Sequence, residues 1–504
     1  MVKQGFFDLR TALDLLDAKH ELTEVTGEVD WDLELGAVTR EVFRRRGPAL
    51  LYTNIKDYNT PGARCRKLAA GLMGSYRRLS MMLGFDDVQP NRALIDHLIE
   101  RNRTLIAPVV VNDGPVHEHV LTGKDIDLYD FPAPRWHHLD GGRYIGTLGC
   151  AVMKDPETGQ QNVGIYRSRI VDRDKLSTYI ISSQNWRVIR EKYQALGRPI
   201  PVAWVFGWDP VMELVAGSPF AREICEYDVM GGYRGAPVPL VKCCTVDLMV
   251  PAAAELVVEG EISLDPATYA LEGPFGEVTG HVSGVPEPRP VTQVSAITHR
   301  DQPIFRGTAA SSMPGAVGEY AYMSAIQRAA IAWETLRTAG IPGILDLFVH
   351  PVNNGMTVVV QIRKLYEGQP KQIAAALWGV ASGRTVGKYV IVVDEDIDPS
   401  NYEAIDWAIN YRVDPGSDDM VIFRSIFGWS LDPGTAPERR NLAELGEGLW
   451  NRLLIDATKT WRFPRRPEWN NEKFPPVVVN RPEDIERVRV NWPNYKFTDW
   501  KVDF

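Results

Sequence analysis

The sequence contains few cysteines and no excess of positive charge. Its five cysteines, Cys65, Cys150, Cys225, Cys243 and Cys244, are odd in number, and no two of them have CxxC spacing. This pattern argues against a disulfide framework or a zinc cluster and favours buried free thiols. Because 65 acidic residues outnumber 56 basic ones, the chain has no net positive field that would attract nucleic acid or an anionic membrane.

Long apolar segments are also missing. No run approaches the roughly 18 apolar residues of a membrane span. Charged residues at positions 3, 8 and 10 stand where a signal peptide would be apolar. We therefore expect a cytoplasmic protein that acts neither on a membrane nor on nucleic acid.

The common catalytic motifs are absent as well. The sequence has no Walker loop, no GxGxxG after a strand, no GxSxG and no HExxH, which argues against nucleotide hydrolysis, serine hydrolysis and zinc proteolysis. His117 and His119 would share one face of a strand and resemble a metal-binding pair, but the sequence identifies no third ligand. We therefore favour a structural role for this pair.

Composition and patterning predict a mixed α/β fold. With 44% hydrophobic and 24% charged residues, the chain is typical of a globular protein of roughly two to four packed units. Helical spacing of apolar residues at 37–46, 64–83 and 92–102, with a strand at 49–52, predicts an α/β domain over residues 1–115. Short alternating segments broken by Gly and Pro predict a β-rich domain over 116–310. A helix at 319–339 followed by alternating strands and helices predicts a second α/β domain over 311–504.

One candidate site segment is a predicted hairpin. The residues 155–159, DPETG, are typical of a turn between strands, and the return strand carries Asn162, Gly164 and Arg167. A glycine inside a strand often marks a bulge or a close approach of a ligand. Asn162 and Arg167 are five residues apart, so they can serve one site only if the strand bulges or ends between them. Alone, the segment is equally typical of an ordinary hairpin with surface polar residues.

A second candidate is the sequence EGPFGE, residues 272–277. Its Gly and Pro residues predict a tight turn, which would bring Glu272 and Glu277 together beside the apolar ring of Phe275. Apolar surroundings and a neighbouring like charge raise a carboxyl pKa, whereas a nearby guanidinium lowers it. Two carboxyl groups with separated pKa values suit general acid catalysis. Near Arg167, they would suit decarboxylation, in which a carboxylate is bound, CO2 leaves and a proton returns to carbon.

Together these two segments resemble the UbiD family of decarboxylases. The resemblance rests on the N-x-G-x-Y-R strand followed about a hundred residues later by E-G-P-F-G-E. It extends to DIDLYDFPAPRWHHLDGGRYIGT, EYDVMGG, LVKC, VPAAAELVVEGEI and LYEGQPKQIAAAL, and so covers about residues 107 to 460. It implies a central split β-barrel like that of flavin reductases and a C-terminal α/β domain that forms homodimers or homohexamers.

The resemblance also implies a reaction and its residues. The reaction is reversible loss of CO2 from an aromatic, heteroaromatic or α,β-unsaturated acid, with prenylated FMN as the electron sink. Glu277 would donate the proton that replaces CO2, Arg167 would bind the flavin and the carboxylate, and Glu272 would position Arg167. A flavin prenyltransferase would supply the cofactor.

Family ligands can be transferred by motif. Mn²⁺ would bind Asn162 and Glu226, with K⁺ beside it, and Asn185 stands where the family has a His ligand. An amide oxygen is a poorer donor than imidazole, so a water would complete the shell. The positions matching flavin-contacting residues are Asn162, Ile165, Arg167, Gln184, Gly217, Ser218, Glu226 and Lys371.

The substrate itself is less well indicated. Candidate walls of its pocket are Ile181, Leu377, Trp378, Phe427 and Trp429. Their aromatic rings favour a flat ring substrate, although core packing explains each of them equally well. Two alternatives stay open: a flavin-binding auxiliary subunit of a multi-subunit aromatic carboxylase and, from the barrel alone, a flavin reductase.

Overall fold

The protein is described by a computed structural model. It describes residues 7–180, 185–310, 313–380, 386–429, 431–440, 445 and 448–496, and the side chain of Asn185 lies outside this description. Among the helices of these ranges, none combines the length and the apolar character needed to cross a membrane.

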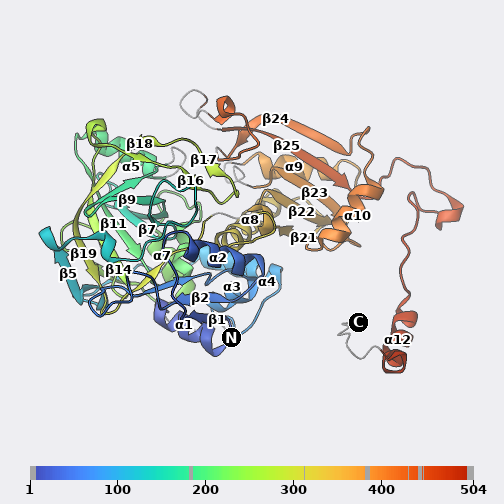
Figure 1. Ribbon diagram of the computed structural model, residues 1–504. Helices are drawn as coiled ribbons and strands as arrows, with labels where there is room; N and C mark the ends of the chain where they lie inside the picture. Colours follow the sequence, from blue (N-terminus) through green and yellow to red (C-terminus); the bar gives the residue numbers. More distant parts are fainter. Residues whose placement is uncertain are drawn as a thin grey trace.

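A curled antiparallel sheet, in the left half of Figure 1, forms the core of the central part, in agreement with the β-barrel domain expected there. Short alternating segments such as VAWVF form its strands because each presents apolar side chains to the core. The neighbouring strands are β6 (Tyr144–Gly146), β9 (Ser168–Asp172), β10 (Lys175–Thr178), β19 (Val291–His299), β14 (Leu256–Ile262), β11 (Ile200–Phe206), β7 (Cys150–Lys154) and β8 (Gln161–Ile165), with β5 (His119–Thr122) on β19.

The hairpin between β7 and β8 confirms the first sequence segment. Asp155 accepts hydrogen bonds from the amides of Glu157 and Thr158, and Gly159 has a φ of 74°, which closes the turn. Strand β8 ends at Ile165 and β9 begins at Ser168. Arg167 therefore lies beyond the end of its strand, so the alternation of faces no longer separates it from Asn162.

Smaller elements surround this sheet. A three-stranded sheet of β13 (Met249–Pro251), β12 (Pro239–Lys242) and β4 (Val109–Val110) lies beside it. Two short ribbons pair β15 (Ala270–Glu272) with β18 (Glu287–Arg289) and β16 (Phe275–Gly276) with β17 (Val282–Ser283). The helices are α5 (Asn185–Ala195), α6 (Val211–Ala216) and α7 (Glu226–Arg234).

The N-terminal part is a four-stranded sheet with helices. Its strands are β1 (Leu22–Val25), β2 (Ala49–Tyr52), β3 (Lys67–Ala70) and β20 (Ile304–Arg306), and its helices are α1 (Leu9–Ala18), α2 (Glu34–Arg44), α3 (Tyr76–Met82) and α4 (Asn91–Arg103). The continuous helix expected over 64–83 is wrong, because residues 67–70 form a strand. Their pairing with β20, more than two hundred residues away, outweighs the local helical spacing.

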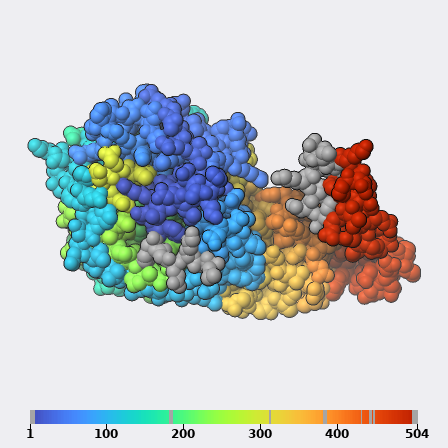
Figure 2. Space-filling model, turned by 90° about the horizontal axis from the view of Figure 1, so that it is seen from below, coloured from blue at the N-terminus to red at the C-terminus, as the bar shows by residue number. Residues whose placement is uncertain are grey.

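The C-terminal part is an α/β layer structure. The strands β21 (Ile344–Val349), β22 (Thr357–Ile362), β23 (Tyr389–Asp394), β25 (Gly448–Ala457) and β24 (Met420–Gly428) form one sheet. Helices α8 (Glu319–Thr338) and α9 (Gln369–Trp378) pack on one face and α10 (Tyr402–Arg412) on the other. The chain then runs to α12 (Pro482–Asn491), which buries no residue and stands apart from the body in Figure 1. Figure 2 shows this end of the molecule opposite the N-terminal and central parts.

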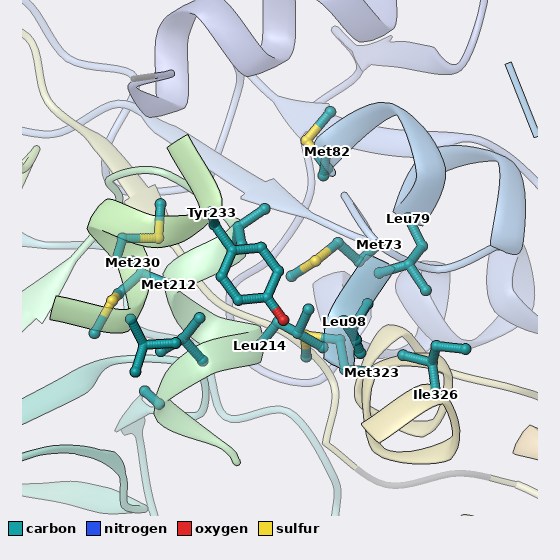
Figure 3. Close-up of a cluster of buried hydrophobic side chains, with 14 of the residues drawn as sticks. Met73, Leu79, Met82, Leu98, Met212, Leu214, Met230, Tyr233, Met323 and Ile326 are labelled. Atoms are coloured by element: carbon teal, nitrogen blue, oxygen red, sulfur yellow. The ribbon is translucent and has the colours of Figure 1, made fainter. Parts of the chain in front are cut away.

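One apolar cluster joins all three parts. Figure 3 shows Leu79 of α3, Leu98 of α4, Met212 of α6, Tyr233 of α7 and Met323 of α8 converging on one another. Each of them is buried. Helix α8 is therefore packed against the N-terminal and central parts as well as against its own sheet.

The start of α8 is also fixed by buried charges. Arg306 Nη2, at the end of β20, lies 2.6 Å from Glu319 Oε2 and 2.8 Å from Glu213 Oε2 of α6. Glu319 also accepts hydrogen bonds from the amides of Gly71 and Met73. Burial raises the pKa of Glu213 to about 8, although Arg306 opposes the shift.

We expect Arg306→Met to destabilise the protein by about 3–5 kcal/mol, because it leaves the buried Glu319 carboxylate without a counter-ion. Thermal denaturation of the variant would measure the loss as a lower midpoint. The matched control is Arg337→Met on the same helix, since the Arg337 side chain is exposed and, among the described residues, forms an ion pair with Glu334 alone. Equal midpoints for the two variants would contradict the role of the buried cluster.

Candidate active site

The site is built around Arg167 and Glu272. Arg167 lies between β8 and β9, and Glu272 is the last residue of β15. The guanidinium donates two parallel hydrogen bonds to the carboxylate, from Nε to Oε1 at 3.0 Å and from Nη2 to Oε2 at 2.8 Å. The Glu272 side chain is only 1% exposed. A bidentate pair in such a buried place fixes the guanidinium plane.

Glu277 contacts the same guanidinium from another side. Nη1 of Arg167 donates to Glu277 Oε1 and, at 3.2 Å, to Ser283 Oγ. Burial raises the pKa of Glu277 and Glu272 adds to the shift, whereas Arg167 opposes it. For Arg167, burial works to lower the pKa, but the two carboxylates outweigh it and raise the pKa. The cluster therefore contains one permanent cation, and Glu277 holds a proton more readily than an exposed glutamate.

Aromatic rings enclose this cluster. The guanidinium carbon of Arg167 lies 4.4 Å from the centre of the Tyr179 ring and 5.2 Å from that of Phe275. Tyr144 donates a hydrogen bond of 2.9 Å from its hydroxyl to Glu272 Oε1. These apolar ring surfaces lower the local polarity, which strengthens the charge interactions within the cluster.

The turn that carries both carboxylates is held from outside. Asp140 accepts hydrogen bonds from the amides of Gly276 at 2.8 Å and His137 at 2.9 Å, and burial raises its pKa to about 6. Gly141 approaches so closely that a Cβ there would stand 2.1 Å from the carbonyl oxygen of Gly273. The HLDGG segment thus packs against the EGPFGE turn and fixes its position.

The cluster opens into a cavity of about 160 Å³. Its lining comes from the central part and from the C-terminal part: Thr147, Ile165, Tyr166, Arg167, Tyr179, Phe275, Glu277, Val278, Thr308, Ala310, Tyr320, Trp429 and Leu431. A wider cavity of about 640 Å³ shares Arg167, Tyr179, Glu277 and Leu431 with it. A small organic acid could enter through the wider space and reach the two carboxyl groups.

A second polar centre lies at the other end of β8. Asn162 Nδ2 donates to Glu226 Oε1 at 2.8 Å, and the amide of Val163 donates to Oε2 at 2.8 Å. Burial raises the pKa of Glu226 to about 7, although the Val163 amide opposes the shift. These residues line a cavity of about 210 Å³ with Gly217 and Ser218. This cavity and the first share Ile165, Tyr166 and Tyr320 in their linings, so the two cavities adjoin along β8.

The residues at this second end fit a hard cation and a phosphate. Asn162 Oδ1 is buried and has no hydrogen-bond partner in the part of the chain that the structure describes. Together with the Glu226 carboxylate, it offers the oxygen ligands that Mn²⁺ accepts. The described residues contain no cluster of three His, Cys, Asp or Glu side chains that could hold a metal instead.

Other residues named from the sequence lie elsewhere. Lys371 Nζ pairs with Asp418 Oδ2 at 3.0 Å on the surface of the C-terminal part. Leu377 and Trp378 are buried in its core and line none of the cavities described above. The ring of Phe427 lies beside Arg452, whose guanidinium carbon is 5.5 Å from the ring centre. Of the candidate substrate walls, Trp429 alone among the described residues lines the 160 Å³ cavity. Ile181, Gln184 and the Asn185 side chain lie outside the described residues.

Sequence reasoning missed five residues that complete the site. They are Asp140, Tyr144, Tyr179, Ser283 and Tyr320. Asp140 and Tyr144 belong to the HHLDGGRYIGT segment, whose paired glycines are typical of a turn but do not identify the residues that it contacts. Tyr179, Ser283 and Tyr320 follow no motif, and only the tertiary structure brings them to Arg167 and Glu277.

Three sequence profiles of one family match the chain in succession. They describe the N-terminal domain, the Rift-related domain and the C-terminal domain of 3-octaprenyl-4-hydroxybenzoate carboxy-lyase, and they match residues 13–99, 108–314 and 321–457.

Individual proteins are similar over nearly the whole chain. The pyrrole-2-carboxylic acid decarboxylase of Pseudomonas aeruginosa is 32% identical, and the match covers 99% of this chain and 100% of that protein. The UbiD-class enzyme HmfF of Pelotomaculum thermopropionicum, solved in complex with FMN, is 28% identical with a TM-score of 0.81, covering 96% and 100% of the two chains. The vanillic acid decarboxylase of Sedimentibacter hydroxybenzoicus in its open form is also 28% identical with a TM-score of 0.81, covering 97% and 99%.

Proposed function

The chain belongs to the UbiD family, and we propose that it catalyses the reversible, non-oxidative decarboxylation of an aromatic, heteroaromatic or α,β-unsaturated acid with prenylated FMN. The observation that carries this proposal is the contact of Arg167 with Glu272 and Glu277 beside one cavity, which adjoins a second cavity lined by Asn162 and Glu226. Relatives that decarboxylate pyrrole-2-carboxylic and vanillic acids support the substrate class.

Each residue of the cluster has a separate role in this proposal. Arg167 binds the substrate carboxylate, and Glu272 fixes the orientation of the guanidinium through its bidentate contact. Prenylated FMN, when bound, supplies the electron sink for the pair that remains on carbon when CO2 leaves. Glu277 then gives its proton to that carbon, so that a C–H bond replaces the broken C–C bond. Burial raises the pKa of Glu277, so it holds this proton to higher pH than an exposed glutamate does.

The second polar centre would hold the cofactor phosphate. Asn162 and Glu226 would bind Mn²⁺, Asn185 would be the third ligand, and K⁺ would lie beside them. Gly217 and Ser218 line the same cavity and are available to the phosphate. The orphaned Asn162 Oδ1 supports this arrangement, because a buried acceptor without a partner is costly unless a cation or donor meets it.

The partners follow from the same proposal. They are a small aromatic acid, CO2, a flavin prenyltransferase that supplies the cofactor, and further copies of this chain in a homodimer or homohexamer. The tail exposes Val478 at 99% and Val479 at 74%, which favours its contact with a second copy. An auxiliary subunit without turnover is disfavoured, because Arg167, Glu272 and Glu277 are all in place.

We expect Glu277→Gln to lower turnover by roughly 10²–10⁴-fold while flavin stays bound, because an amide of the same shape cannot give a proton to carbon. CO2 release and the flavin absorbance of the purified protein would measure the two effects. Glu287→Gln is the matched control, since Glu287 is an exposed carboxylate that lines only the wider cavity. Near-normal turnover by Glu277→Gln would end the assignment of the proton donor.

The rate should also depend on pH through Ser283. A hydrogen bond from Ser283 lowers the pKa of Glu277, so Ser283→Ala should raise that pKa further. Because a general acid is lost as the pH rises through its pKa, the alkaline fall in kcat should move to higher pH in the variant. A profile of kcat against pH would measure the shift. An unchanged or lowered alkaline limb would argue against proton donation by Glu277.

The metal end gives a separate prediction. Glu226→Ala should lose both bound manganese and flavin, since the carboxylate and the phosphate would share one cation. Elemental analysis and flavin absorbance of the purified variant would measure both losses. Asp228→Ala is the control, because Asp228 lies in the same helical turn but is only partly buried. Full flavin occupancy in Glu226→Ala would refute the shared cation.

A further inference from the structure

Asp140 is a buried carboxylate that has no ion pair among the described residues, and it is only 4% exposed. Burial raises the pKa of Asp140 to about 6, and Arg40 and Arg135 are among the groups that oppose the shift. Arg40 donates to the carbonyl oxygen of Trp136 at 2.6 Å, however, and Arg135 pairs with Asp32 at 3.6 Å. Neither guanidinium is a counter-ion of Asp140. A buried carboxylate of this kind is unfavourable unless hydrogen bonds compensate it, so its contacts indicate its role.

Both oxygens of Asp140 accept a hydrogen bond from the main chain. Oδ1 accepts from the amide of Gly276 at 2.8 Å, and Oδ2 accepts from the amide of His137 at 2.9 Å. The two donors use different oxygens, so both oxygens must be acceptors. A carboxylate meets this requirement, whereas an asparagine would turn an NH2 group toward one of the two N–H groups. The geometry therefore requires aspartate at this position.

The contact of Asp140 with Gly276 bears on the proton donor, because Gly276 directly precedes Glu277. On the other side of the turn, the amide of Gly141 donates to the carbonyl oxygen of Pro274 at 2.8 Å. The backbone that leads into Glu277 is therefore held at two points by consecutive residues of one loop. Since the Glu277 carboxyl itself shares a single nitrogen of Arg167 with a serine, its position depends on this backbone.

The charge of Asp140 also acts on Glu277. Burial raises the pKa of Glu277, Arg167 opposes the shift, and Glu272 and Asp140 add to it. The charged and titratable groups around the two carboxyl groups are Arg167, Glu272, Tyr144, His281 and Tyr320 on the side of Glu277, and Arg40, Arg135 and His137 on the side of Asp140. Asp140 lines none of the cavities described above, so its charge can be removed without altering a group that contacts the substrate.

We propose that Asp140 is a positioning residue for proton donation by Glu277. Its two acceptor oxygens hold the turn that places the Glu277 carboxyl beside Arg167, and its negative charge favours the protonated form of that carboxyl. The proposal rests on the proposed function above and adds a residue that acts on the donor from behind the turn, without contact with the substrate.

The test is the dependence of kcat on pH in flavin-loaded Asp140→Asn. The acid would be the one that the parent protein decarboxylates fastest in a panel that includes pyrrole-2-carboxylate and vanillate. We expect kcat at the optimum to fall by roughly tenfold or more, because a displaced catalytic group loses much of its efficiency. We also expect the alkaline fall in kcat to move to lower pH, since Glu277 loses a neighbouring negative charge and releases its proton more readily. KM should change little.

A double variant separates charge from structure. Ser283→Ala should move the alkaline fall to higher pH, as argued above, so Asp140→Asn combined with Ser283→Ala should lie between the two single variants. The matched control is Asp172→Asn, which removes an exposed aspartate at the end of β9 and should leave kcat and its pH profile unchanged. A purely structural role of Asp140 would lower kcat without moving the alkaline fall, and that result would overturn the proposal.

A second readout needs no turnover. Hydrogen–deuterium exchange of the flavin-free protein should show faster uptake in the peptide containing residues 272–277 in Asp140→Asn than in the parent or in Asp172→Asn. Unchanged uptake would contradict the positioning role.

A further variant protects the test against misfolding of Asp140→Asn. Asp140→Ser also removes the charge, but its hydroxyl can accept from one amide and leaves room for a water at the other. It should move the alkaline fall in the same direction. Loss of folding in both variants would assign Asp140 to stability alone and would overturn the proposal. Failure of the proposed function would show differently, as absence of CO2 release from every acid of the panel by the flavin-loaded parent protein.

Discussion

The balance of charge around Arg167 governs the rest of the site. One guanidinium cannot satisfy two buried carboxylates equally: Glu272 receives two parallel hydrogen bonds, whereas Glu277 shares a single nitrogen with Ser283. Glu272 is therefore the fixed counter-ion, and Glu277 bears the cost of burial that raises its pKa. Two chemically identical side chains acquire different properties from their surroundings alone, which is what acid catalysis beside a fixed cation requires.

The fold maintains this asymmetry through contacts between distant segments. Strand β8 ends at Ile165, two residues before Arg167. The alternation of side chains between the two faces of a strand therefore does not direct the Arg167 guanidinium away from the side of Asn162. Asp140 and Tyr144, from one segment, contact the turn that carries both carboxylates. A polar network of this kind is rigid only when every member is satisfied, and removal of any one partner would leave a buried charge without compensation.

The sequence was sufficient for local features and insufficient for distant ones. The DPETG hairpin is determined by neighbouring residues, and the structure confirms it. The helix expected over 64–83 failed because β20 pairs with residues 67–70 from far along the chain. The same distinction applies to the site: motif matching named Arg167 and Glu277, whereas Tyr320 and Ser283 lie beside them only through tertiary packing. Lys371 matches a family motif, yet its ammonium pairs with Asp418, a contact that no local pattern encodes.

The charged groups of the site and the remaining walls of its cavity come from different parts of the chain. The charged groups of the Arg167 cluster all belong to the central part, while Tyr320, Trp429 and Leu431 reach the same cavity from the C-terminal part. Arg306 of β20 contacts both Glu319 at the start of α8 and Glu213 of α6 in the central part, so the residue after Glu319, Tyr320, is held close to the central part. Trp429 and Leu431 follow the end of β24. Among the described residues, neither forms a hydrogen bond with the EGPFGE turn that carries the two carboxylates. Residues after β24 can therefore differ between relatives without altering the charge balance at Arg167, which gives this fold a way to change its acid while keeping its proton donor.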